Sequence, residues 1–140
     1  MKTEVHFLST AFNCTEPKDY FINDGCFGDD AARYLIQQLR AQGVQTADEP
    51  GQEDFGWYFT FHADGVEHCL IIGFQPNEPS TGDRWLGSIE RRTSFFGSLF
   101  GGRTRGISLA AVQAIDSALK ASPDIQRIVW HERGSDDELA

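Results

Sequence analysis

The chain has 140 residues, enough for one compact domain with a sizeable core and too few for two ordinary domains. It is 40% hydrophobic and 24% charged, and no apolar run approaches the roughly 20 residues of a membrane span, which is typical of a soluble globular protein without a membrane partner. A net charge of −9 argues against a nucleic-acid binder that works through a basic face, and it is compatible with a basic protein partner.

The cysteines and the amino-terminal residues predict a cytoplasmic protein. Cys14, Cys26 and Cys69 are an odd number without metal-ligand spacing, which indicates reduced thiols and neither a metal nor another cofactor. Glu4 and His6 interrupt the first ten residues, so this stretch does not read as a secretory signal peptide.

The first third of the chain predicts one strand and one helix. Residues 2–9 alternate, with Val5 and Phe7 on one side of a strand. After an irregular stretch, a helix begins in the acidic residues that follow Gly28 and stops at Gly43. Its apolar residues recur at helical spacing, so this face should lie on a sheet. The stripe comprises Ala32, Leu35, Ile36 and Leu39.

Residues 55–74 predict a β-hairpin, around which we expect the fold to be organised. Its turn is Asp64-Gly65, a pair that tolerates the positive φ angles of a two-residue turn. A turn at this point fixes the pairing of the two arms and separates an apolar face from a mixed one. The predicted apolar pairs are Phe61–His68, Phe59–Leu70, Trp57–Ile72 and Phe55–Phe74. The predicted mixed pairs are Tyr58–Ile71, Thr60–Cys69 and His62–Glu67.

Three more elements are expected after the hairpin. Residues 84–91 alternate and should form a strand beside the second hairpin arm. Ser108 is suited to cap a second helix, which ends at Ser122-Pro123, and residues 125–131 should form the last strand. The stripe of this helix comprises Val112, Ile115, Ala118 and Leu119.

The arginine-flanked segment 91–105 contains no acidic residue and predicts a short amphipathic helix. Its large apolar side chains should either cap the core or pack against another chain, of which a second copy in a homodimer is the commonest kind. These side chains are Phe95, Phe96, Leu99 and Phe100.

Together these elements predict an α+β fold: a two-layer sandwich of one mostly antiparallel sheet with two helices on one face. A ferredoxin-like split βαβ variant, enlarged by a strand or two, is the leading topology. Residues 1–132 should form this single domain, followed by an acidic, disordered tail over 133–140.

The sequence contains no known catalytic signature, which favours a non-enzymatic protein. His62 and His68 fall on opposite faces of the hairpin, so they should not bind one metal ion. The candidate residues for binding a ligand or a partner are instead carboxylates, aromatic residues and one arginine. They are Glu53, Asp54, Trp57, Tyr58, Trp85, Phe96, Phe100 and Arg103.

The pentapeptide at residues 53–57, placed after a helix that begins with Gly28-Asp29-Asp30, supports a resemblance across residues 25–75. The chain resembles a loose group of small uncharacterised bacterial proteins, several of them similar in size and acidity to toxin-neutralising immunity proteins. The resemblance implies a bacterial, cytoplasmic and non-enzymatic protein, and it implies no catalytic residues.

Two functional hypotheses follow. The first is a protein-binding domain, of an immunity or regulatory type, that binds a basic protein partner drawn in by the negative charge. The second is a small-molecule-binding protein or an enzyme, with an aromatic-lined pocket between the sheet and the helices. Trp57, Tyr58, Trp85 and Trp130 are the aromatic residues that would line it.

Overall fold

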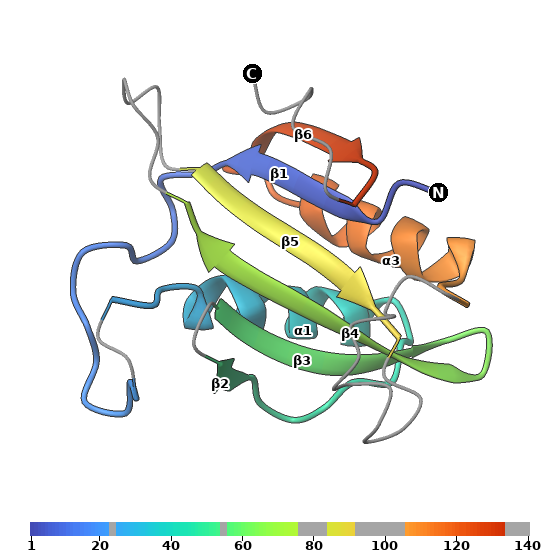
Figure 1. The fold of residues 1–140 in the computed structure, drawn as a ribbon, viewed down its shortest axis with the longest axis horizontal. Coiled ribbons are helices and arrows are strands. Elements are labelled where there is room, and N and C mark those ends of the chain that lie inside the picture. Colours follow the sequence, from blue (N-terminus) through green and yellow to red (C-terminus); the bar gives the residue numbers. More distant parts are fainter. Residues whose placement is uncertain (23–24, 54–55, 76–83, 92–105, 134–140) are drawn as a thin grey trace.

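The computed structural model describes residues 1–22, 25–53, 56–75, 84–91 and 106–133. Figure 1 shows these residues as one sheet with two helices behind it. The helices are α1 (Asp29–Ala41) and α3 (Leu109–Lys120). The strands are β1 (Glu4–Leu8), β2 (Gly51–Glu53), β3 (Gly56–Ala63), β4 (Val66–Phe74), β5 (Arg84–Glu90) and β6 (Gln126–His131).

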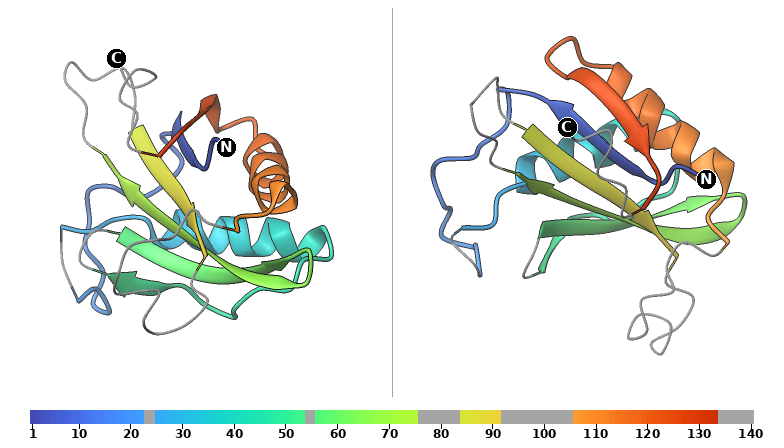
Figure 2. Two further views of the ribbon diagram at one scale, coloured as in Figure 1. Left: turned by 45° about the vertical axis from the view of Figure 1, so that its right-hand side comes forward. Right: turned by 45° about the horizontal axis from the view of Figure 1, so that its top comes forward.

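The six strands form one antiparallel sheet in the order β2-β3-β4-β5-β1-β6. Strands β2 to β5 follow the chain as a meander, whereas β1 inserts between β5 and β6 from the other end of the sequence. The sheet is curled, and the helices lie on one of its faces in all three ribbon views (Figures 1 and 2). The predicted α+β class is therefore confirmed, while the ferredoxin-like variant and the sandwich description stay predictions.

The hairpin has the predicted register. Asp64 and Gly65 have φ angles of 53° and 75°, as a two-residue hairpin turn requires. Every predicted pair from Trp57–Ile72 to His62–Glu67 is present, on both faces. Phe55, the predicted partner of Phe74, lies outside the described residues.

The core lies between the sheet and the two helices. Every second residue of β1, β3 and β5 is buried there. The β5 backbone lies close to Val5 at Gly87, where an added Cβ would be 3.2 Å from Cγ1 of Val5. The largest fully buried aromatic side chains are Phe7, Phe59, Phe61 and Trp85. We call this the inner face of the sheet, and we call the face turned away from the helices the outer face.

Both helices form where the sequence predicts. Helix α1 follows Gly28, and all four residues of its predicted stripe are buried against the sheet. Ser108 caps α3, because its side chain accepts a hydrogen bond from the Ala110 backbone N–H at 3.0 Å. In the predicted apolar stripe of α3, Val112 is only partly buried and the other three residues are buried.

The structure adds one strand that the sequence did not predict. Residues 51–53 form the edge strand β2. The Tyr58 ring lies over Gly51, where an added Cβ would come within 2.7 Å of the ring. The predicted short helix within 91–105 falls largely on residues 92–105, which lie outside the described residues, and so does the tail from 134. No helix among the described residues is long and apolar enough to cross a membrane.

Candidate functional site

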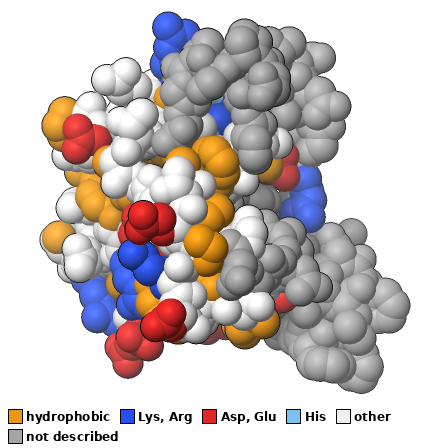
Figure 3. Space-filling view, turned by 90° about the vertical axis from the view of Figure 1, so that its left-hand side faces the viewer, with side chains coloured by type: hydrophobic (Ala, Val, Ile, Leu, Met, Phe, Trp, Pro, Cys, Tyr) orange, Lys and Arg blue, Asp and Glu red, His pale blue; other side chains and the backbone are white. Residues whose placement is uncertain are grey.

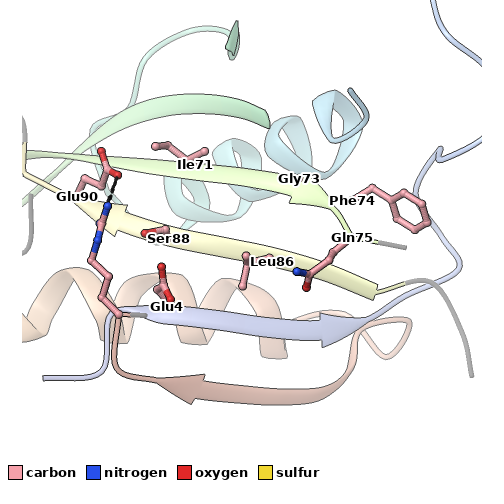
Figure 4. Close-up of a pocket in the computed structure, with 9 residues that line it drawn as sticks. Glu4, Ile71, Gly73, Phe74, Gln75, Leu86, Ser88 and Glu90 are labelled. Carbon is pink, nitrogen blue, oxygen red and sulfur yellow. Dashed lines mark hydrogen bonds and ion pairs between the residues drawn. The ribbon is translucent and has the colours of Figure 1, made fainter. Parts of the chain in front are cut away.

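A groove of about 330 Å³ lies on the outer face of the sheet, along the middle of strand β5. We call it the sheet groove. Figure 4 shows it over β4, β5 and β1, with the helices on the far side of the sheet. Its lining residues are Glu4, Ile71, Gly73, Phe74, Gln75, Leu86, Ser88, Glu90 and Arg133.

Antiparallel pairing brings these residues together. Ser88 on β5 lies opposite Glu4 of β1 on one side and opposite Ile71 of β4 on the other, so three strands contribute one lateral row. Leu86 similarly lies opposite Gly73, where the missing side chain leaves room above the sheet. The sheet groove therefore depends on β1 being the neighbour of β5, a contact between chain segments about 80 residues apart.

One end of the sheet groove is charged. Glu90 has a side chain only 9% exposed, and both terminal nitrogens of Arg133 lie 3.4 Å from the same carboxylate oxygen, Oε2 (Figure 4). Glu4 contributes a second carboxylate, 17% exposed, from the neighbouring strand. The described charges at this end are thus two acidic groups and one arginine.

Two histidines adjoin this charged end. The Nδ1 atom of His131 is 3.7 Å from Oε1 of Glu4, and the rings of His131 and His6 have centroids 5.2 Å apart. Both side chains are buried on the outer face. Among the described residues, however, no group of three or more histidine, cysteine, aspartate or glutamate side chains is arranged to hold a metal ion.

The described lining of the sheet groove suits binding better than covalent chemistry. It has one hydroxyl, on Ser88, whose oxygen is buried and makes no hydrogen bond to any described group. A serine nucleophile needs a base within hydrogen-bonding reach, and no such contact is present at Ser88 in the part of the chain described. What the groove offers is an apolar floor with carboxylates at one end.

None of the predicted site residues that the structure describes is among the lining residues of the sheet groove. Trp57 and Trp85 lie on the inner face, Tyr58 lies on the outer face beside Ile71, and Glu53 ends the edge strand β2. The remaining four, Asp54, Phe96, Phe100 and Arg103, lie outside the described residues.

The two inner tryptophans fill the space between the sheet and the helices. Trp57 is 4% exposed and Trp85 is 0% exposed. The Nε1–H group of Trp57 donates to the Cys26 carbonyl at 2.9 Å, and that of Trp85 donates to the Ser9 carbonyl at 3.1 Å. Both indoles thus tie a loop to the sheet, and their described contacts are those of core residues.

His68 is a buried histidine that links the hairpin to α3. Its Nε2 accepts a hydrogen bond from the Ser108 backbone N–H at 3.1 Å, so its Nδ1 carries the proton and donates to the Val66 carbonyl, also at 3.1 Å. Burial lowers the pKa of His68 because desolvation disfavours the charged imidazolium. The two hydrogen bonds and the burial of His68 indicate that this residue has a structural role.

A second exposed surface lies on the loop between β1 and α1. Tyr20 and Ile22 are among the most exposed large hydrophobic residues described, and the hydroxyl of Tyr20 donates to the Asp29 carboxylate. Figure 3 shows the side of the molecule where this loop runs, with several hydrophobic side chains at its surface. The hydrogen bond from Tyr20 to Asp29, together with burial, raises the pKa of the Tyr20 hydroxyl.

Searches of protein-family models, of curated proteins and of solved structures return no match to this chain.

Sequence reasoning did not identify the sheet groove. Strand alternation does place Leu86, Ser88 and Glu90 on one side of β5 and Glu4 on one side of β1. Strand alternation does not predict that β1 pairs with β5, because no local sequence pattern encodes this pairing.

Proposed function

We propose that this protein is a non-enzymatic protein-binding domain and that it binds a basic partner through the sheet groove. The observation that carries the proposal is the groove itself: an elongated hollow on the outer face, with an apolar floor and two carboxylates at one end. Protein interfaces combine such apolar contact with a few well-placed charges. An immunity or regulatory role in a bacterial cytoplasm is the narrower form of the proposal. It is compatible with Cys14, Cys26 and Cys69, none of which forms a disulfide.

The overall charge supports a basic partner. At −9, the chain should attract a positively charged protein over several ångströms, and added salt should slow the association because it screens this attraction. The carboxylates of Glu4 and Glu90 would then meet the partner's cations at the charged end of the sheet groove.

A comparative capture experiment tests this function. The tagged chain is exposed to lysate of the source cells beside the variant Ser88→Arg, which puts a large cation into the sheet groove. Gln37→Arg is the matched control, since it makes the same charge change on the exposed side of α1. A protein captured by the native chain and the control, and lost with Ser88→Arg, is the expected result. Equal capture by all three folded chains would contradict the proposal.

Small-molecule binding is a second candidate, favoured by the volume of the same groove. About 330 Å³ lies at the lower end of the range for ligand pockets, roughly 300–1,000 Å³. This candidate differs from the sequence-based hypothesis, which expected a pocket on the inner face lined by aromatic residues. It predicts that a metabolite extract shifts the melting temperature of the native chain but not that of Ser88→Arg.

We also propose that the fold is an enlarged ferredoxin-like arrangement. In this interpretation β1, α1, β4, β5, α3 and β6 form the two interlocked split βαβ units, and β2 and β3 extend one edge. The order β4-β5-β1-β6 within the sheet supports this assignment. Backbone contacts measured by NMR that pair β1 with strands other than β5 and β6 would rule it out.

A further inference from the structure

The start of helix α3 is fastened to the hairpin by two hydrogen bonds that meet at Ser108. The Ser108 backbone N–H donates to Nε2 of His68 at 3.1 Å, and the Ser108 hydroxyl donates to the carboxylate of Asp64 in the hairpin turn. The same hydroxyl accepts from the Ala110 backbone N–H, which is the cap of α3. The residue that caps the helix therefore also joins it to the turn and to the second arm of the hairpin. We call the contacts of Ser108 with His68 and Asp64 the hairpin latch.

The hairpin latch requires a neutral imidazole. A backbone N–H can only donate, so Nε2 of His68 is an unprotonated acceptor, and the ring proton lies on Nδ1, which donates to the Val66 carbonyl at 3.1 Å. Both ring nitrogens are thus bonded to backbone groups. A second proton would place an N–H group of the ring against the N–H group of Ser108, where no hydrogen bond can form. The contact between His68 and Ser108 and the charged form of His68 therefore exclude each other.

The surroundings of His68 also disfavour the imidazolium. The side chain is 0% exposed, and burial lowers its pKa, since desolvation disfavours the charged form. Arg91, which follows β5, and His62 on β3 act in the same direction, whereas the bond to the Val66 carbonyl and the Asp64 carboxylate oppose them. The first turn of α3 contains no acidic residue that could compensate the charge. A protonated imidazole is therefore more stable in water than in this buried position.

We propose that the hairpin latch is an acid-sensitive switch: protonation of His68 breaks its bond to Ser108 and frees the start of α3 from the second hairpin arm. At neutral and higher pH the latch is closed. As the pH falls through 6.5, the ordinary pKa of a histidine in water, the open form takes up a proton that the closed form excludes, so the equilibrium shifts toward opening. This inference goes beyond the proposed binding function and does not depend on it.

Amide hydrogen exchange of the isotope-labelled full chain, followed by NMR, tests the switch. Exchange is measured at about pH 7.5 and about pH 5.5, one unit above and one unit below the ordinary pKa of 6.5, and is expressed as a protection factor, which removes the direct effect of pH on the exchange rate. The protection factor of the Ser108 amide should fall severalfold, and by at most about tenfold, because protonation of the open form favours opening. The Ile89 amide, which donates to the Thr3 carbonyl at 3.0 Å in the middle of the sheet, is the internal control and should keep its protection.

Two substitutions of His68 separate the switch from a purely structural role. His68→Gln does not titrate, but its side-chain oxygen can accept from the Ser108 N–H, so the protection of Ser108 should not depend on pH. His68→Phe keeps a ring beside Phe61, whose centroid is 5.7 Å from that of the imidazole, but offers no acceptor, so Ser108 should be weakly protected at both pH values. His62→Gln is the matched control: it removes the other hairpin histidine, whose Nε2 is 3.8 Å from Oε1 of Glu67, and should keep the loss of protection seen in the native chain.

Three results would overturn the inference. They are equal protection of Ser108 at the two pH values in the native chain, the same pH-dependent loss in His68→Gln, and an equal loss at Ile89, which would mean that the whole sheet unfolds. The first and the third are measured on the native chain, so the test holds even if a substitution prevents folding. A loss confined to the start of α3, together with ring nitrogen shifts that report protonation of His68 over the same pH range, supports the switch.

Discussion

Replacing Trp57 tests whether the inner face of the hairpin supports the fold as described. The indole is buried, it packs against Phe21 with ring centroids 5.1 Å apart, and its Nε1–H donates to the carbonyl of Cys26. Trp57→Ala removes this packing and should lower the free energy of unfolding by about 3–5 kcal/mol. Trp57→Phe keeps a buried ring but leaves the Cys26 carbonyl without its donor, and should cost about 1–3 kcal/mol.

The matched control lies on the same strand and faces the other way. Thr60 is half-buried on the outer face, so Thr60→Ala should cost less than about 1 kcal/mol, mostly through the lower strand propensity of alanine. Urea unfolding of the four chains, with the slope held common, gives the three differences. Equal losses for Trp57→Ala and Thr60→Ala would refute the assignment of inner and outer faces.

Three further predictions concern the elements that support the sheet. Because burial lowers the pKa of His68 from its ordinary value of 6.5, the unfolded chain takes up this proton more readily than the folded chain. The stability that neutral His68 contributes should be fully present above pH 6.5 and should decline as the pH falls through 6.5 toward the lowered pKa. The melting temperature of His68→Gln, measured over the same pH range, should lack this decline. Ser108→Ala removes the cap of α3 and should cost about 1 kcal/mol in urea unfolding, whereas an unchanged midpoint would show that the cap is unimportant. Gly28→Ala should destabilise more than Gly43→Ala in the same assay: both positions have positive φ, but only at Gly28 would an added Cβ meet a backbone atom, 3.0 Å from the Ile72 carbonyl oxygen.

The hairpin was predictable because its information is local. Asp64-Gly65 defines the turn, and a two-residue turn leaves only one register in which the alternating side chains separate into two faces. The helices were predictable for a similar reason, since Gly28, Ser108 and the apolar stripes define them within short stretches.

The rest of the sheet depends on contacts that are distant in sequence. Edge strand β2 forms from residues of low strand propensity, because the open edge of β3 offers backbone partners and the Tyr58 ring covers Gly51. The insertion of β1 beside β5 creates the sheet groove, and strand alternation alone could not show which strands are neighbours. Sequence reasoning missed the candidate site for that reason. It selected the aromatic residues Trp57 and Trp85 as site residues, but both lie on the inner face and belong to the core.

An NMR map of the binding surface tests the central claim most directly. The isotope-labelled chain is mixed with the captured partner, and perturbed backbone amides are assigned to the two faces of the sheet. If binding occurs through the sheet groove, the perturbations will centre on residues 71–75 and 86–90 and leave the exposed side of α1 unchanged. Perturbations confined to α1 and α3, with 71–75 and 86–90 unaffected, would contradict the account.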